Sequence, residues 1–135
     1  TFALPEIRSG TVADAASIKL PKRIPYHIAM EMLLTGRWIE AEEAARWGLV
    51  NHIHPADELM AEARKQAELI AAGPPLVYAA VKEIVRAAED MKFQDALARI
   101  TTSQLATVEK LYNSEDQQEG ARAFAEKRAP VWKGR

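Results

Sequence analysis

The stretch AEEAARWGLVNHIHP, residues 41–55, decides the fold. Ala41 to Trp47 has the alanine and glutamate content that favours a helix, and Gly48 follows where glycine relieves the left-handed end of a helix. Leu49 to Ile53 is short and mostly apolar, and Pro55 stops it, which predicts a short strand. We therefore expect a mixed α/β arrangement in this part of the chain.

The residues before this stretch predict further short elements. Thr1 to Leu4 has the pattern of a strand, and Pro5 to Gly10 that of a turn. Two short helices are predicted, at Ala13 to Leu20 and at Tyr26 to Leu34, with Gly36 just past the second. So few strand residues cannot build a sheet of their own, since even a hairpin is marginal in water. We expect this region to pack against residues outside it or against another chain.

From residue 56 onward the pattern is helical throughout. Helices are predicted at Ala56 to Ala72, Val77 to Ala88 and Phe93 to Tyr112, and a capping box at Ser114 to Gln117 begins a last helix that runs to about Arg128. The chain divides softly near Pro55, into an α/β region at 1–55 and a helical region at 56–135. The fold class expected is α/β, predominantly α-helical with one or two short strands.

Composition excludes several classes of function. With 135 residues, a net charge of -1 and a pI near 6.3, the chain lacks the basic surface that nucleic acid requires. Zero cysteines exclude disulfides and zinc–thiolate sites and are compatible with a cytoplasmic location. No apolar run has the length of a bilayer span. His52 and His54 share one face of the predicted strand but lack a third ligand nearby, so no metal is expected.

Blocks spread along the whole chain resemble the crotonase (enoyl-CoA hydratase/isomerase) family. They are Phe2-Ala3-Leu4-Pro5-Glu6-Ile7-x-x-Gly10, Met32-x-Leu34-Thr35-Gly36-Arg37, Ala41-x-Glu43-Ala44-x-x-Trp47-Gly48-Leu49-Val50-Asn51, Ala80-x-Lys82-Glu83 and the region from Ser114 to Arg135. Their order and spacing both match, and the ending looks most like that of the carnitinyl-CoA dehydratase branch. The resemblance implies a crotonase-like fold, of which this chain is the C-terminal half.

Glu6 is the catalytic residue that the resemblance implies. Taken alone, a glutamate beside a proline is most often a solvated turn residue. In the family, the Pro-Glu-Ile turn carries one of two glutamates that hold a water and exchange protons with the α- and β-carbons of an acyl-CoA thioester. Paired carboxylates can divide the roles of base and acid. The other glutamate, the enolate-stabilising N–H groups and most of the CoA surface are expected before the start of this sequence.

Three further residues are candidates for contact with the CoA substrate. Asp14 falls where a backbone donor to the catalytic water lies in the family, in a segment whose usual paired glycines are absent here. A helix N-cap is the competing interpretation of Asp14. Lys127 matches a family position that can reach CoA phosphate across a subunit boundary, and Tyr112 lies near a surface that packs against the adenine. A surface lysine and core packing are the alternatives for Lys127 and Tyr112.

Two classes of function stay open at this point. In the first, the complete protein is a hydro-lyase or an isomerase acting on an acyl-CoA, and this chain supplies Glu6 and trimer-forming helices. In the second, the isolated chain is a non-catalytic module for oligomerisation or CoA binding. The expected partners are an acyl-CoA substrate and copies of the same chain in a trimer or hexamer. No cofactor is expected beyond the coenzyme A of the substrate.

Overall fold

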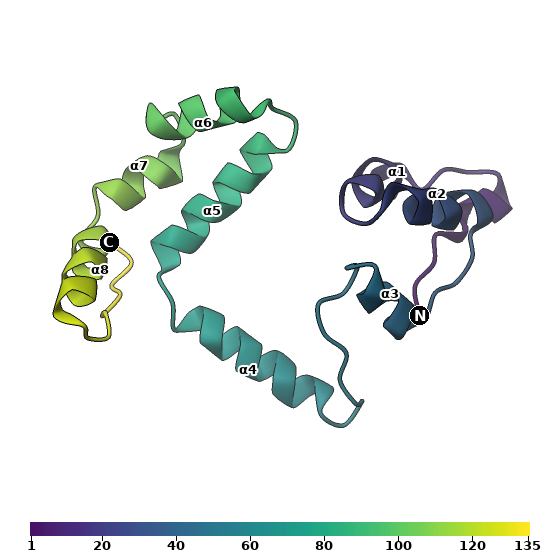
Figure 1. Cartoon of the computed structure of the whole chain (residues 1–135), viewed down its shortest axis with the longest axis horizontal. Helices are drawn as coiled ribbons and strands as arrows, with labels where there is room; N and C mark the ends of the chain where they lie inside the picture. Colours follow the sequence, from purple (N-terminus) through teal and green to yellow (C-terminus); the bar gives the residue numbers. More distant parts are fainter. The chain divides into compact units, whose positions relative to one another are not determined.

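The computed structural model describes all residues, Thr1–Arg135, as two compact units (Figure 1). Thr1–Ala63 forms the first unit and Arg64–Arg135 the second. The boundary between the units falls inside a helix, and the division predicted near Pro55 stays a prediction. No segment among the helices combines the length and apolarity that a bilayer crossing requires. The predicted cytoplasmic location stays a prediction.

Short helices around one small core build the first unit. Its elements are η1 (Pro5–Ser9), α1 (Asp14–Lys19), η2 (Leu20–Lys22), α2 (Tyr26–Thr35) and α3 (Ala41–Arg46). Helix α2 buries Ile28, Ala29 and Met32 at helical spacing, and Ile39 and Ala44 complete the core. Gly36 caps α2 in the left-handed region at φ 60°, as the sequence predicts. The predicted helices at 26–34 and 41–47 are confirmed.

The predicted strands do not form. Phe2 and Ile39 make a single antiparallel bridge, in which the amide of each donates to the carbonyl of the other at 2.9 Å. Leu49 instead donates its amide to the carbonyl of Ala44 at 2.8 Å, and with Val50 it packs against the core of the first unit. A strand needs a neighbouring strand to satisfy its backbone groups, and no such neighbour runs beside Leu49 to Ile53. The predominance of helix is confirmed, whereas the strand detail is not.

Helices alone build the second unit, apart from the end of the chain. Helix α4 (Leu59–Ala71) enters it, and α5 (Pro75–Ala88), α6 (Phe93–Thr101), α7 (Ala106–Tyr112) and α8 (Glu115–Glu126) follow. Helix α5 contacts both α6 and α7 (Figure 1). Ala80, Leu105 and Val108 form the centre of this contact. One face of the helix predicted over residues 77–88, which carries Ala80 and Ile84, therefore packs against α7.

The long helix predicted over Phe93 to Tyr112 is wrong. It breaks between α6 and α7, where Ser103 adopts a left-handed conformation at φ 54°. The hydroxyls of Thr101 and Thr102 donate to the carbonyls of the preceding turn, including that of Ala98 at 2.6 Å from Thr102. Such bonds compete with helix continuation, and β-branched threonines lower helix propensity further. Four consecutive polar residues, Thr101 to Gln104, therefore end one helix before the next begins.

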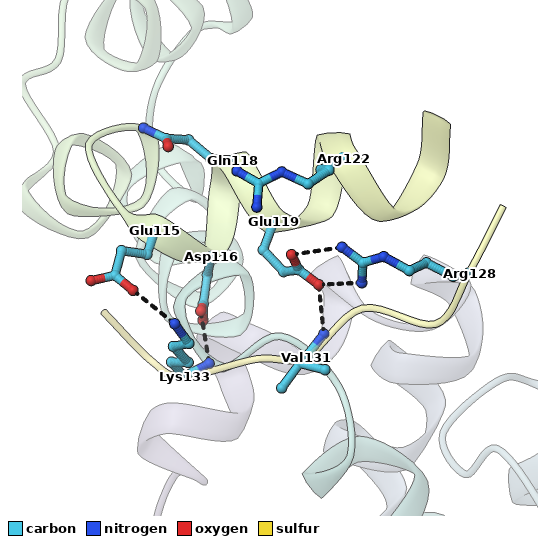
Figure 2. A pocket seen from close by; sticks show the side chains of 8 residues that line it. All are labelled: Glu115, Asp116, Gln118, Glu119, Arg122, Arg128, Val131 and Lys133. Carbon is cyan, nitrogen blue, oxygen red and sulfur yellow. Dashed lines mark hydrogen bonds and ion pairs between the residues drawn. The ribbon is translucent and has the colours of Figure 1, made fainter. Parts of the chain in front are cut away.

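The last residues of the chain fold back onto α8. Asp116 is buried and accepts hydrogen bonds from the amides of Lys133 at 2.7 Å and Gly134 at 2.8 Å. Glu119 accepts from the guanidinium of Arg128 and from the amide of Val131 (Figure 2). We call the segment Ala129–Arg135 the C-terminal strap. Two carboxylates of α8 therefore hold this strap in place.

Half of the predicted capping box at the start of α8 is present. The hydroxyl of Ser114 accepts from the amide of Gln117 at 3.1 Å, as expected for an N-cap serine. The amide of Ser114, which the box would pair with the Gln117 side chain, donates instead to the carbonyl of Leu111 at 3.1 Å. The carbonyl of Leu111, near the end of α7, thus takes the place that the capping box gives to the side chain of Gln117.

Candidate functional site

Glu6 lies on the 3-10 turn η1, which a proline begins and a glycine ends. Pro5 presets the backbone for the turn, and Gly10 closes it in the left-handed region at φ 72°. The carbonyl of Glu6 accepts hydrogen bonds from the amide and the hydroxyl of Thr11, both at 3.2 Å. The backbone of Glu6 is thereby fixed, and its side chain is left for other contacts.

The carboxylate of Glu6 faces a cavity and has an unpaired oxygen. The cavity has a volume of about 220 Å³. Apart from Glu6, its wall is largely apolar and consists of Leu4, Ile7, Thr11, Val12, Ala13, Ser17, Met30, Leu33 and Leu34. Glu6 Oε2 is buried and has no hydrogen-bond partner. Buried carboxylate oxygens are normally satisfied, so an unpaired one at a cavity makes Glu6 a candidate functional residue.

An ion-pair cluster joins α2, α3 and the segment between them. The guanidinium of Arg37 donates two hydrogen bonds to the carboxylate of Glu43, one of them at 3.0 Å. Its Nε lies 3.0 Å from Glu31 Oε1 in an ion pair, and its Nη2 donates a hydrogen bond to Glu31 Oε2 at 3.4 Å. Trp47 donates its indole N–H to Glu43 at 3.3 Å. The hydrogen bonds from Arg37 and Trp47 hold the pKa of Glu43 below its usual range, so this carboxylate is a fixed anion.

Asp14 lies near Glu6 in sequence but outside the cavity wall. Its neighbour Ala13 and Ser17, one turn further along α1, line the cavity, whereas Asp14 is exposed to solvent. The alternative prediction of an N-cap is wrong: Asp14 is the first residue of α1, and Ala13 occupies the N-cap. An acidic side chain in the first turn still interacts favourably with the helix dipole. The role of Asp14 in substrate binding stays a prediction.

Tyr112 lines an apolar cavity of the second unit. This cavity has a volume of about 350 Å³. Its walls come from α5, α7, α8 and the C-terminal strap, and include Leu76, Val77, Leu111, Gly120 and Trp132. Tyr112 is 64% exposed, so core packing does not account for it, whereas its neighbour Val108 is buried. A flat apolar ligand is chemically suited to such walls.

Lys127 ends helix α8 in a left-handed conformation, at φ 54° and ψ 39°. Glycine is the residue that favours this position, because it lacks the Cβ that clashes with the backbone. The side chain of Lys127 is exposed, and the next residue, Arg128, is tied to Glu119 by two hydrogen bonds (Figure 2). The backbone therefore turns at Lys127, at the end of α8, and the lysine side chain is exposed to solvent.

Sequence reasoning identified Glu6 but missed the residues that surround it. The structure gathers Glu6 with apolar side chains of α2 and leaves Asp14 outside. Arg37 and Glu43 belong to the quoted motifs, so their importance had a sequence signal. Their pairing had none, because an arginine and a glutamate six residues apart across a helix end are not neighbours by periodicity.

Comparison with known proteins assigns the chain to a family. The family model described as enoyl-CoA hydratase/isomerase matches residues 1–135. The chain belongs to this family. Among its curated relatives, the carnitinyl-CoA dehydratases of Salmonella typhi and Proteus mirabilis are each 46% identical over 136 aligned residues, covering 100% of this chain and 52% of the relative. The predicted resemblance to that branch is confirmed.

Solved structures of the enoyl-CoA hydratase/isomerase family share the fold. An enoyl-CoA hydratase from Mycobacterium tuberculosis H37Rv is 37% identical with a TM-score of 0.85, covering 99% of this chain and 52% of the other. An enoyl-CoA hydratase/isomerase from Mycobacterium paratuberculosis is 28% identical with a TM-score of 0.88, covering 100% and 50%. The chain therefore has a crotonase-like fold, and it spans about half the length of the relatives that it matches.

Proposed function

We propose that this chain supplies Glu6 as an acid–base carboxylate to an enzyme that adds or removes water across the α,β-bond of an acyl-CoA thioester. The carrying observation is the buried, unpaired Oε2 of Glu6 at a largely apolar cavity. A carboxylate that the protein leaves without a partner is available to take a proton from water or to return one to carbon. Relatives named carnitinyl-CoA dehydratase and enoyl-CoA hydratase support the same class of reaction.

The proposed reaction needs two proton transfers. In hydration, a base takes a proton from water, the water oxygen bonds to the β-carbon, and electrons move onto the thioester as an enolate. An acid then returns a proton to the α-carbon, so that one water is added overall. Glu6 performs one of these transfers, and a second carboxylate in the complete protein performs the other. The chain by itself is therefore expected to leave an enoyl-CoA unchanged.

Substitution of Glu6 tests this proposal in the complete protein that contains the chain. Hydration of crotonyl-CoA is followed by the loss of its conjugated thioester absorbance. Glu6→Gln keeps the shape of the side chain but cannot exchange the proton, so turnover should fall by about 10²- to 10⁴-fold. Glu42→Gln, at an exposed glutamate of α3, makes the same change of charge and should retain turnover. Equal turnover in the two variants would refute the role of Glu6.

A second activity of the same family is an open alternative. Double-bond migration also moves protons at the carbons of an acyl-CoA, but it adds no water. A 3-enoyl-CoA offered to the complete protein separates the two. The hydratase proposal expects 3-hydroxyacyl-CoA from 2-enoyl-CoA at a much higher rate than 2-enoyl-CoA from 3-enoyl-CoA. The opposite ratio would favour an isomerase.

We also propose that the complete protein assembles as a trimer or hexamer. Apolar side chains exposed on the second unit support self-association, since Val81 and Val85 on α5 are 50% and 59% exposed and Phe93 on α6 is 73% exposed. Light scattering measures the assembly directly. A monodisperse monomer at micromolar concentration would contradict this proposal.

A further inference from the structure

Gly36 packs directly against the turn that carries Glu6. A Cβ added at Gly36 would lie 3.0 Å from Ile7 Cγ2, 3.3 Å from the Cα of Pro5 and 3.4 Å from Arg8 Nε. The contact with Pro5 is the most demanding, because it is with backbone and cannot be relieved by rotating a side chain. Pro5 and Ile7 flank Glu6 in sequence. A side chain at residue 36 therefore presses on the turn that carries Glu6.

The residues after Gly36 hold the chain just before the same turn. Ile39 exchanges two backbone hydrogen bonds with Phe2, each of 2.9 Å. Between these two contacts lies Arg37, whose guanidinium is tied to Glu43 on α3 and lies beside Glu31 on α2. The segment 36–39 is thus anchored to both helices and contacts the Glu6 turn on one side.

We propose that Gly36, braced by the Arg37–Glu43 ion pair, is a positioning residue for Glu6. This inference rests on the proposed function, because it concerns where the reacting carboxylate lies. Glu6 Oε2 has no hydrogen-bond partner, whereas the Glu6 carbonyl is held by the amide and the hydroxyl of Thr11, so the turn backbone sets where the carboxylate lies. The backbone in turn rests on Gly36. Small displacements of a reacting group are costly to catalysis, up to about 10²-fold for 1 Å.

Gly48 provides a matched control within the same unit. Both glycines follow a helix in the left-handed region, Gly36 at φ 60° and Gly48 at φ 76°. A Cβ at Gly48 would meet nothing within 4 Å. Alanine at either position therefore carries the same kind of backbone strain, and only alanine at residue 36 presses on the Glu6 turn. A difference in turnover between Gly36→Ala and Gly48→Ala therefore reports the contact of residue 36 with Pro5 and Ile7.

The test compares Gly36→Ala and Gly48→Ala in the complete protein, with crotonyl-CoA as substrate and thermal unfolding as a check of the fold. We expect both variants to lose thermal stability, and only Gly36→Ala to lose turnover, with kcat about tenfold lower and KM within about twofold of the parent. Ile7→Ala removes the nearest atom, so adding it to Gly36→Ala should restore part of kcat. Equal kcat in the two glycine variants would overturn the inference.

A second variant covers the case in which Gly36→Ala fails to fold. Arg37→Lys keeps the positive charge but loses the paired hydrogen bonds to Glu43, so kcat should fall several-fold with KM unchanged. An unchanged kcat in Arg37→Lys would then count against the inference. Glu6→Gln, measured alongside, separates the two levels. If Glu6→Gln lowers turnover but Gly36→Ala and Arg37→Lys do not, only the positioning role of Gly36 is refuted. If Glu6→Gln has no effect on turnover, the proposed function of Glu6 is itself refuted.

Discussion

The two units differ in the hydrogen bonding of a buried carboxylate, which is incomplete at Glu6 in the first unit and complete at Asp116 in the second. In Thr1–Ala63, Glu6 Oε2 is buried without a partner and faces an apolar cavity. In Arg64–Arg135, Asp116 is buried and each of its two oxygens accepts a backbone amide of the C-terminal strap. A satisfied carboxylate stabilises the fold, whereas an unsatisfied one lowers stability and is retained where chemistry needs it. With the proposed function, the carboxylate of Asp116 has a structural role and that of Glu6 a reactive one.

Removing Asp116 should have the largest effect on stability. Asp116→Ala removes the acceptor of the amides of Lys133 and Gly134, and a hydrogen bond to a charged group contributes about 1.5–3 kcal/mol. We expect the free energy of unfolding to fall by ~3 kcal/mol. Urea unfolding followed by circular dichroism measures it. Glu115→Ala is the control, since its exposed pair with Lys133 should contribute little. A similar loss in both variants would show that Asp116 has no special role.

Acid should weaken the second unit through Glu119. Hydrogen bonds from Arg128 and from the amide of Val131 lower the pKa of Glu119 from 4.5 to about 2. As pH falls below about 4.5 the unfolded chain binds this proton first, so the stabilisation is complete above that pH and is lost progressively down to about pH 2. Unfolding midpoints at several pH values measure the slope. Glu119→Gln should flatten it, whereas Glu109→Gln, at an exposed residue of α7, should not.

A smaller effect is expected at Lys127, where structure and ligand binding can be separated. Lys127→Gly relieves the positive φ and should raise the free energy of unfolding by about 0.5–1 kcal/mol. Lys127→Ala removes the ammonium group without this relief. If the lysine contacts a CoA phosphate, both variants should raise the KM for acyl-CoA in the complete protein. Unchanged KM in both would make Lys127 a surface lysine only.

Local signals predicted much of the fold. The glycines at 36 and 48 marked the ends of α2 and α3, and the serine at 114 marked the start of α8, because each effect acts within one turn of backbone. The break at Ser103 escaped prediction, since apolar residues on either side continued the helical period across it. The prediction of a strand at Leu49 to Ile53 is wrong because strand pairing depends on a neighbouring strand, which local sequence does not specify.

The candidate site was predictable only in its chemistry. The motif around Glu6 indicated a catalytic carboxylate, but part of the apolar wall of its cavity comes from Met30, Leu33 and Leu34 of α2, more than twenty residues away in sequence. The same holds for the contact of Gly36 with Pro5, which depends on tertiary packing. The resemblance to the family therefore pointed to the reaction, whereas the burial of an unpaired Glu6 Oε2 required the structure.

A single-turnover measurement tests the central claim most directly, because it separates the chemical step from binding. The complete protein in excess over crotonyl-CoA is compared with its Glu6→Gln variant, and the Kd of the acyl-CoA is measured in parallel. The account expects the chemical step to slow by on the order of 10³-fold while Kd stays within about twofold. A chemical step of unchanged rate, or a loss confined to Kd, would contradict the role of Glu6 as the acid–base carboxylate.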